Sequence, residues 1–150
     1  MQALGVKLEF KYLEIDDSRI KDVMALFEQG KDSGGTSSMS LESALKGLAT
    51  SVVLVCIDDE QIIGAIEFSP IDREEVRIRN LVVEESRRRG GIGGELLARA
   101  ETRIKSDYTP VFIKTIPMLY SYALFSKFGY SWDSNSEYDW YKAFYSIQSV

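Results

Sequence analysis

Three apolar segments rich in β-branched residues follow one another in the middle of the chain, and only short polar links separate them. They read SVVLVCI (51–57), QIIGAIEFSP (61–70) and EEVRIRNLVV (74–83). Strands joined by links this short pair antiparallel, because a parallel pair needs a long crossover connection. The sequence therefore predicts an antiparallel three-stranded meander at the centre of the fold.

The segments before and after the meander show alternating strand-like and helical patterns. The expected strands are 6–15, 111–116 and 138–147, and the expected helices are 16–30, 41–49, one that ends near Ser106, and 120–129. One further short strand after Tyr130 is an option. We expect residues 1–150 to form a single mixed α/β domain, with a mainly antiparallel sheet of six or seven strands flanked by about four helices.

The composition excludes several kinds of site. The chain has no histidine and a single cysteine, Cys56, which lies inside an apolar segment and is expected to pack in the core. A zinc site of the usual kind and an internal disulfide are therefore excluded, and we expect no metal. The net charge of −5 disfavours nucleic-acid binding. The chain has no run of 18 apolar residues and no signal-peptide pattern, so we expect a cytoplasmic protein that does not enter membranes.

The segment VEESRRRGGIGGELLARAE (83–101) leads from the third strand of the meander into a helix that has no evident side-chain cap. A helix N-terminus carries unpaired backbone N–H groups and a partial positive charge, so it attracts anions. Glycines let the backbone approach such a ligand closely, and arginines pair with phosphate. The segment therefore predicts a phosphate or pyrophosphate site, and a plain solvated turn is the alternative.

Two common phosphate motifs do not fit this segment. A P-loop needs a lysine followed by serine or threonine after its last glycine, and the chain has none there. The dinucleotide fingerprint fails at Leu96, its last position, and it follows the first strand of a βαβ unit rather than a meander.

Instead, the sequence resembles the GCN5-related N-acetyltransferase (GNAT) superfamily. The family's pyrophosphate motif, Gln/Arg-x-x-Gly-x-Gly/Ala, stands here as Arg88-Arg89-Gly90-Gly91-Ile92-Gly93, between IRNLVVEES and GELLARAE. The order of elements over nearly the whole chain and the segment LFSKFGY are also similar to this family. The resemblance implies a GNAT fold and an acetyl-CoA-dependent N-acetyltransferase, with acetyl-CoA as cosubstrate.

The resemblance also implies how acetyl-CoA is held. The turn would bind the pyrophosphate through its backbone amides, and the end of the preceding strand would separate from its neighbour and pair with the pantetheine arm. An amine then attacks the thioester directly, while backbone N–H groups near a strand bulge polarise its carbonyl. The implied binding residues are Leu81, Val82, Val83, Arg88, Arg89, Gly90, Gly91, Ile92, Gly93, Gly94 and Phe125.

The chain departs from the family at the positions of the proton-transfer groups. Many members carry a tyrosine in the C-terminal helix that protonates the departing thiolate, and Phe125 stands there; Met118 replaces an asparagine that often precedes that helix. If the chain is an enzyme impaired by this change, Phe125→Tyr should raise its turnover. A glutamate used by some members as general base falls at Arg77, where a solvated strand face is favoured.

Asn80 and Glu67 are the catalytic candidates. Asn80 interrupts the apolar face formed by Val76 and Ile78, and it either contacts the acceptor or supports the strand bulge. Glu67 is the best carboxylate for a general base, although an exposed strand glutamate is the simpler reading.

The sequence leaves alternatives open for the acceptor, the oligomeric state, the aromatic tail segment and catalysis itself. The acceptor is an amine-bearing small molecule or a peptide, and the protein is a monomer or a homodimer. The aromatic segment EYDWYKAFY (137–145) packs in the core, forms a dimer contact or lines the acceptor site. A non-catalytic acyl-CoA-binding or sensing module of the same fold is the main alternative to an enzyme.

Overall fold

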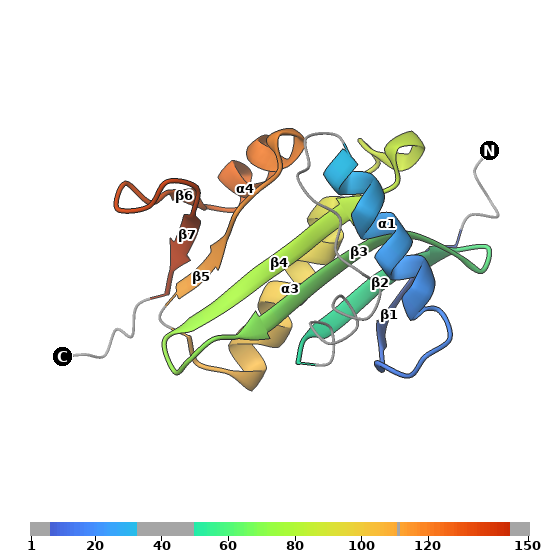
Figure 1. Cartoon of the computed structure of the whole chain (residues 1–150), viewed down its shortest axis with the longest axis horizontal. Helices are drawn as coiled ribbons and strands as arrows, with labels where there is room; N and C mark the ends of the chain where they lie inside the picture. The colour runs from blue at the N-terminus through green and yellow to red at the C-terminus, as the bar shows by residue number, and fades with distance from the viewer. Residues whose placement is uncertain (1–6, 33–49, 111, 145–150) are drawn as a thin grey trace.

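The computed structural model describes residues 7–32, 50–110 and 112–144, and they form one seven-stranded mixed sheet with helices on both faces (Figure 1). The strand order across the sheet is β1-β2-β3-β4-β5-β7-β6. The strands are β1 (Glu9–Leu13), β2 (Val52–Asp58), β3 (Gln61–Pro70), β4 (Glu75–Val83), β5 (Phe112–Thr115), β6 (Ser131–Trp132) and β7 (Trp140–Ala143). The predicted α/β fold is confirmed, and so is the optional short strand after Tyr130.

The meander forms as the short links predict. Strands β2, β3 and β4 pair antiparallel in sequence order, and β1 adds antiparallel to the outer edge of β2. Strand β5 pairs parallel to β4, which is possible because helix α3 provides the crossover between them. Strands β7 and β6 complete the sheet antiparallel.

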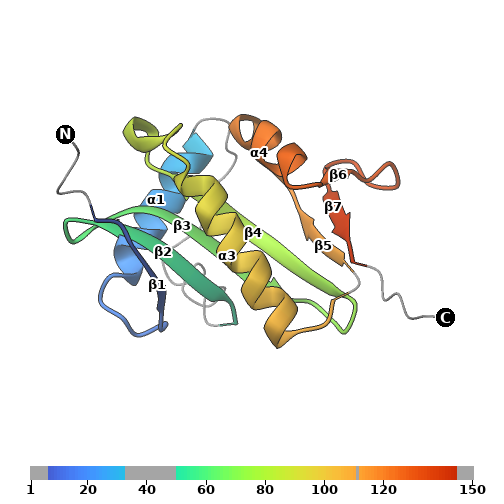
Figure 2. The ribbon, with the colours of Figure 1, turned by 180° about the vertical axis from the view of Figure 1, so that it is seen from behind.

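Two long helices cover opposite faces of this sheet. Helix α1 (Ile20–Asp32) lies on one face, here called the α1 face, and helix α3 (Ile92–Asp107) lies on the other, the α3 face (Figures 1 and 2). The remaining described helices are the short α4 (Tyr122–Lys127) and the 3-10 turns η1 (Glu85–Arg87) and η2 (Leu119–Ser121). The expected helix 41–49 lies outside the described residues.

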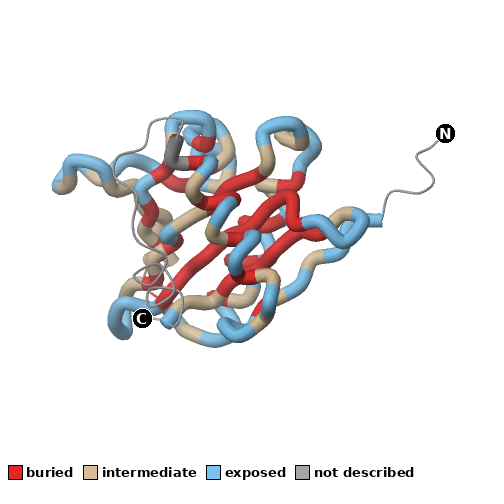
Figure 3. Tube along the Cα trace, turned by 45° about the vertical axis from the view of Figure 1, so that its right-hand side comes forward, coloured by how far each residue is buried: buried red, intermediate tan, exposed pale blue. Residues whose placement is uncertain are grey.

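Each face of the sheet has its own apolar core, and the buried parts of the chain run along the central strands (Figure 3). On the α3 face, Leu54, Ile66 and Val76 pack with α3 residues such as Leu96 and Ala100. The α1-face core contains Val53, Val55, Ala65 and Val82, with Val23 and Phe27 of α1. Cys56 belongs to the α3-face core with no exposed surface, as expected.

A bulge in β4 changes which residues reach each face. The register with β3 shifts between Glu67 and Phe68, whose partners are Asn80 and Ile78, so Arg79 is an extra residue. Val76 and Ile78 before the bulge and Leu81 after it all belong to the α3-face core. The prediction that Asn80 interrupts the face of Val76 and Ile78 is therefore wrong, because the extra residue turns Asn80 to the α1 face.

The bulge coincides with the point where β4 loses its other neighbour. The pairing of β4 with β5 runs from Glu75–Phe112 to Ile78–Thr115 and stops there. The Thr115 hydroxyl donates a hydrogen bond of 3.1 Å to the Ile78 carbonyl and so closes the ladder. Beyond this point β4 continues to Val83 while β5 diverges from it (Figure 1). The end of β4 thus has an open edge, as the resemblance implied.

Candidate functional site

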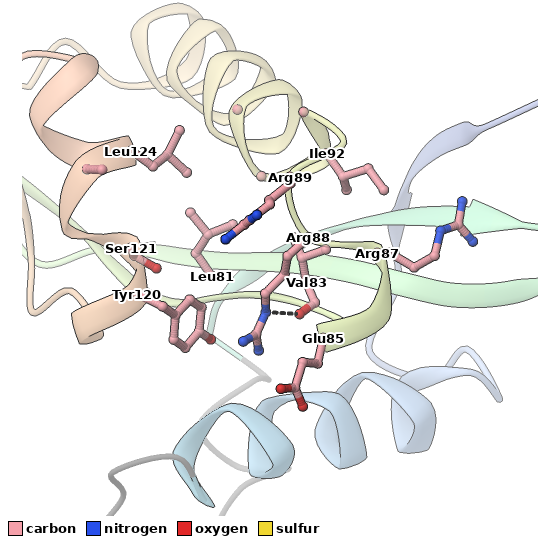
Figure 4. A pocket seen from close by; sticks show the side chains of 14 residues that line it. Leu81, Val83, Glu85, Arg87, Arg88, Arg89, Ile92, Tyr120, Ser121 and Leu124 are labelled. Carbon is pink, nitrogen blue, oxygen red and sulfur yellow. Dashed lines mark hydrogen bonds between the residues drawn. The ribbon is translucent and has the colours of Figure 1, made fainter.

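A cavity of about 600 Å³ opens beside the end of β4, between the glycine-rich turn and the η2–α4 segment (Figure 4). Its size is typical of pockets that bind small molecules and cofactors. The lining residues are Leu81, Val83, Glu85, Arg87, Arg88, Arg89, Gly91, Ile92, Gly93, Gly94, Tyr120, Ser121, Ala123 and Leu124.

The glycine-rich turn places the uncapped N-terminus of α3 at this cavity. Gly91 precedes the first residue of α3 with a φ of 85° and no side-chain cap, and the first intrahelical bond runs from Glu95 N–H to Gly91. The N–H groups of Ile92, Gly93 and Gly94 therefore lack intrahelical acceptors, and these three residues line the cavity. This geometry is suited to an anion.

Close packing against α4 explains one of these glycines. A Cβ built on Gly93 would lie 3.2 Å from a methyl group of Leu124, a tight contact that a larger residue would make only if the Leu124 side chain shifted. Glycine therefore lets the turn lie close to α4 at this point.

The three arginines of the turn have different partners. Arg87 forms an ion pair of 2.7 Å with Asp58, which fixes the turn to the end of β2. Arg88 Nε donates to the Val83 carbonyl at 2.9 Å, and its guanidinium lies 3.9 Å from the Tyr120 ring centroid. Arg89, with a φ of 75°, is exposed and has no ion pair within the described residues. The whole guanidinium of Arg89 is therefore available to an anionic ligand, whereas that of Arg88 is held through Nε and the ring of Tyr120.

The open edge of β4 presents backbone hydrogen-bonding groups to the cavity. Glu84 N–H donates to the Ile63 carbonyl of β3, which makes these two residues a hydrogen-bonded pair. Because such pairs alternate along an antiparallel ladder, Leu81 and Val83 direct their own N–H and C=O groups away from β3. Both residues line the cavity. The Val83 carbonyl accepts a hydrogen bond from Arg88 Nε, and the other groups of this edge can pair with an extended ligand as a further strand would.

The structure places most, but not all, of the sequence-predicted binding residues at this cavity. Val82 lies on the α1 face, where a Cβ added to Gly30 of α1 would come within 2.7 Å of it. Gly90 is exposed in the turn and is not part of the cavity wall. Phe125 is also absent from the wall, because its ring turns into the core and meets Tyr130 edge-on, with centroids 5.1 Å apart.

Other wall residues were not anticipated from the sequence. They are Glu85, Tyr120, Ser121, Ala123 and Leu124. Tyr120 is the first residue of the expected helix 120–129, but in the structure it belongs to η2, and α4 begins at Tyr122. Burial raises the pKa of the Tyr120 hydroxyl, and the nearby Arg88 charge opposes that effect. Tyr120 is thus a neutral hydroxyl at neutral pH.

The two catalytic candidates contact each other on the α1 face. Asn80 Nδ2 donates a hydrogen bond of 2.8 Å to one oxygen of Glu67, and the Ser51 hydroxyl donates one of 2.6 Å to the other. Glu67 is only 4% exposed, so the reading of an exposed strand glutamate is wrong. The hydrogen bonds from Asn80 on β4 and from Ser51, which precedes β2, offset the cost of burying this carboxylate of β3.

The other charged residues named from the sequence are paired. Arg77 binds Glu75 at 3.1 Å and Asp139 at 2.9 Å, so it is tied into an ion-pair network rather than simply solvated. The hydrogen bond from Arg77 lowers the pKa of the Asp139 carboxyl. In the aromatic tail segment, Trp140 packs against Tyr122 with ring centroids 4.9 Å apart.

The described residues were also compared with the requirements of a metal site and of a membrane-spanning helix. They contain no group of three or more histidine, cysteine, aspartate or glutamate side chains arranged to hold a metal ion. Within the same residues, no helix has the length and apolar character needed to cross a membrane.

Comparison with known families agrees with this geometry. The family described as "Acetyltransferase (GNAT) domain" matches residues 49–131, which is more than half of the chain. The chain belongs to the GNAT acetyltransferase family. The matched region contains the meander, the glycine-rich turn, α3 and α4, and so includes the whole cavity wall. A search of curated proteins finds no match.

Solved structures share the GNAT fold over nearly the whole chain. The PaiA N-acetyltransferase of Thermoplasma acidophilum, in complex with coenzyme A, has a TM-score of 0.71 at 16% identity and covers 92% of this chain and 99% of its own. A GNAT family acetyltransferase of Elizabethkingia anophelis with acetyl-CoA bound has a TM-score of 0.68 at 17% identity, with coverages of 91% and 98%. N-acetylglutamate synthase of Neisseria gonorrhoeae, complexed with coenzyme A and N-acetyl-glutamate, has a TM-score of 0.74 at 13% identity, and the match covers 92% of this chain and 36% of the synthase. Identities this low show a common fold.

Proposed function

We propose that the protein transfers an acetyl group from acetyl-CoA to a primary amine by direct attack. One observation carries this proposal: a single cavity combines the edge of β4 at Leu81 and Val83, with which no described strand pairs, with the uncapped N-terminus of α3. A ligand that fits both must have an extended amide-bearing arm joined to an anionic group. The pantetheine pyrophosphate of acetyl-CoA has this construction.

In this proposal the N–H groups of Ile92, Gly93 and Gly94 hold the pyrophosphate, and Arg89 supplies a positive charge beside it. Leu81 and Val83 pair with the amides of the pantetheine arm. Complexes of the Thermoplasma and Elizabethkingia proteins with coenzyme A and acetyl-CoA support this choice of ligand.

The reaction then needs an amine beside the thioester carbonyl. The new C–N bond forms as the C–S bond breaks, the amine loses a proton, and the thiolate leaves and gains one. Glu67 and Asn80 lie at the bulge where the open edge begins, on the face opposite the cavity-lining helix α3. We assign them to the amine: Asn80 as a contact, and Glu67 as the carboxylate that accepts its proton, directly or through water.

The test is calorimetric titration of the protein with acetyl-CoA and with acetyl-pantetheine, which lacks the pyrophosphate. Gly91→Asp is the key variant and Gly91→Asn its matched control. Both residues have the same size and tolerate the positive φ of Gly91, and a Cβ there meets no atom within 4 Å. Only aspartate adds negative charge.

We expect acetyl-CoA to bind at least about tenfold more weakly to Gly91→Asp than to Gly91→Asn, and acetyl-pantetheine to bind both alike. If the unmodified protein does not bind acetyl-CoA, the proposal is wrong.

A second candidate function is acyl-CoA binding without turnover. The observation that favours it is Phe125, which stands where many relatives carry a proton-donating tyrosine and is buried away from the cavity. Release of free CoA from acetyl-CoA in the presence of amines distinguishes the two, because a binding module releases none above the rate without protein.

A further inference from the structure

The β4 bulge places two neighbouring polar side chains on the same face of the sheet. Arg79 Nε donates to the Ser69 hydroxyl at 2.8 Å, and Asn80 Nδ2 donates to Glu67 at 2.8 Å. Glu67 and Ser69 are two residues apart on β3, so they share the α1 face. In a regular strand the neighbours Arg79 and Asn80 would point to opposite faces. The bulge therefore brings a guanidinium and an amide together where β4 loses β5.

Both side chains keep unused hydrogen-bonding groups. Because the Asn80 NH₂ group faces the Glu67 carboxylate, its Oδ1 is fixed as an acceptor, and it has no partner within residues 7–32, 50–110 and 112–144. The Arg79 guanidinium is held only through Nε, and its two Nη groups have no acceptor among the same residues. Arg77, on the same strand, differs because Glu75 and Asp139 neutralise it.

We infer that the acceptor is an amino acid, with its carboxylate bound by the Arg79 Nη groups and its amine by Asn80 Oδ1 beside the charge of Glu67. This inference rests on the proposed function, and it names the substrate class of that same site. The guanidinium fork matches a carboxylate in a bidentate manner. A buried carboxylate behind the amide favours a cationic or proton-losing nitrogen.

The two anchors, Arg79 and Asn80, are neighbours in β4, and their partners on β3 are two residues apart. Glu67 and Ser69, which hold Asn80 and Arg79 in place, lie about 6.6 Å apart along β3. The nitrogen and the carboxylate carbon of an α-amino acid are about 2.5 Å apart. Anchors on neighbouring residues therefore favour a small ligand whose amine and carboxylate are on the same carbon atom.

Polycationic acceptors fit this arrangement poorly. A polyamine has no carboxylate for Arg79 and would bring a second ammonium group towards the guanidinium. A lysine side chain within a peptide likewise has no carboxylate near its reacting nitrogen. Two positive charges close together repel each other, and this repulsion opposes binding.

The experiment measures CoA release from acetyl-CoA with the standard L-amino acids, and then with the amide and the decarboxylated amine of the best substrate. Spermidine serves as the polyamine probe. We expect kcat/KM for the free acid to exceed that for its amide at least about tenfold, the effect of one charged hydrogen-bond pair. Arg79→Gln should abolish this preference through KM, and Arg79→Lys should keep part of it. Arg73→Gln, an exposed arginine in the β3–β4 turn, is the matched control and should leave it unchanged.

The outcomes separate this inference from the proposed function. Absence of acetyl-CoA binding contradicts the proposed function itself. If acetyl-CoA binds, but no free amino acid is acetylated, or amides and spermidine react as fast as acids, the inference is overturned while the proposed function stands. A preference for acids that survives in Arg79→Gln also overturns it, because the carboxylate is then bound elsewhere.

Discussion

The guanidinium of Arg88 lies 3.9 Å from the centroid of the Tyr120 ring, while Arg88 Nε donates a hydrogen bond of 2.9 Å to the Val83 carbonyl. This arrangement joins the glycine-rich turn, the end of β4 and the η2 turn. These are the three walls of the cavity. The shape of the proposed acetyl-CoA site therefore depends on one arginine and the aromatic ring beneath it.

Replacing this ring should loosen the site. Tyr120→Leu removes the cation–π contact and should lower both the free energy of unfolding, by about 0.5–1 kcal/mol, and the affinity for acetyl-CoA. Tyr120→Phe keeps the ring, so the free energy of unfolding and the affinity for acetyl-CoA should both stay close to those of the unmodified protein. Urea unfolding and acetyl-CoA titration of the two variants check this, and equal behaviour of both would contradict the role of the ring.

The Glu67 carboxylate should matter for turnover and not for cofactor binding. Glu67→Gln keeps the size of the side chain but cannot take a proton, so kcat should fall by about 10²-fold or more while the acetyl-CoA dissociation constant stays unchanged. Glu75→Gln, on the neighbouring strand and paired with Arg77, is the control. A kcat within about threefold of the unmodified protein would show that Glu67 is not the base.

Phe125→Tyr should not improve the enzyme. From the sequence alone, this change is expected to raise the turnover of an impaired enzyme, but Phe125 is 1% exposed and does not line the cavity. The added hydroxyl would enter the core and cost about 1–3 kcal/mol of stability. Steady-state turnover and thermal unfolding of the variant test this. A clear rise in kcat would mean that the ring moves into the cavity when substrate binds.

The protein should lose stability in alkaline solution through Tyr130. Burial and the neighbouring Glu101 carboxylate raise the pKa of Tyr130 above its ordinary value of 10.0. The unfolded chain releases this proton as the pH passes 10 while the folded chain retains it, so the free energy of unfolding falls with rising pH, by up to about 1.4 kcal/mol per unit.

Tyr130→Phe should flatten this decline, measured by urea unfolding between about pH 8 and pH 11. Tyr138→Phe is the control, because Tyr138 is 63% exposed. An unchanged slope in Tyr130→Phe would assign the alkaline instability to other groups.

The parts of the fold that depend on local rules could be predicted from the sequence. Links this short allow only antiparallel pairing, so the meander followed directly. The glycine-rich turn was recognisable because an uncapped helix start has few uses besides holding an anion. Both conclusions need only residues that are close together in the chain.

The details at the bulge could not be predicted, because they depend on one extra residue. Hydrophobic alternation assigns Asn80 to the face of Val76, and nothing in the pattern marks Arg79 as the inserted residue. The burial of Glu67 depends on donors from Ser51 and Asn80, which are 16 and 13 residues away in the sequence. Tyr120 was missed as a wall residue for a similar reason, since its partner Arg88 is on the glycine-rich turn.

The measurement that tests the central claim most directly is a titration of ¹⁵N-labelled protein with acetyl-CoA, followed through backbone amide chemical shifts. The account predicts the largest shifts at the amides of Leu81, Val83, Ile92, Gly93 and Gly94, which form the open edge of β4 and the start of α3. Amides of β1 (Glu9–Leu13), at the far edge of the sheet, should not move. Shifts confined to other elements, or none at saturating acetyl-CoA, would contradict the assignment of this cavity as the acetyl-CoA site.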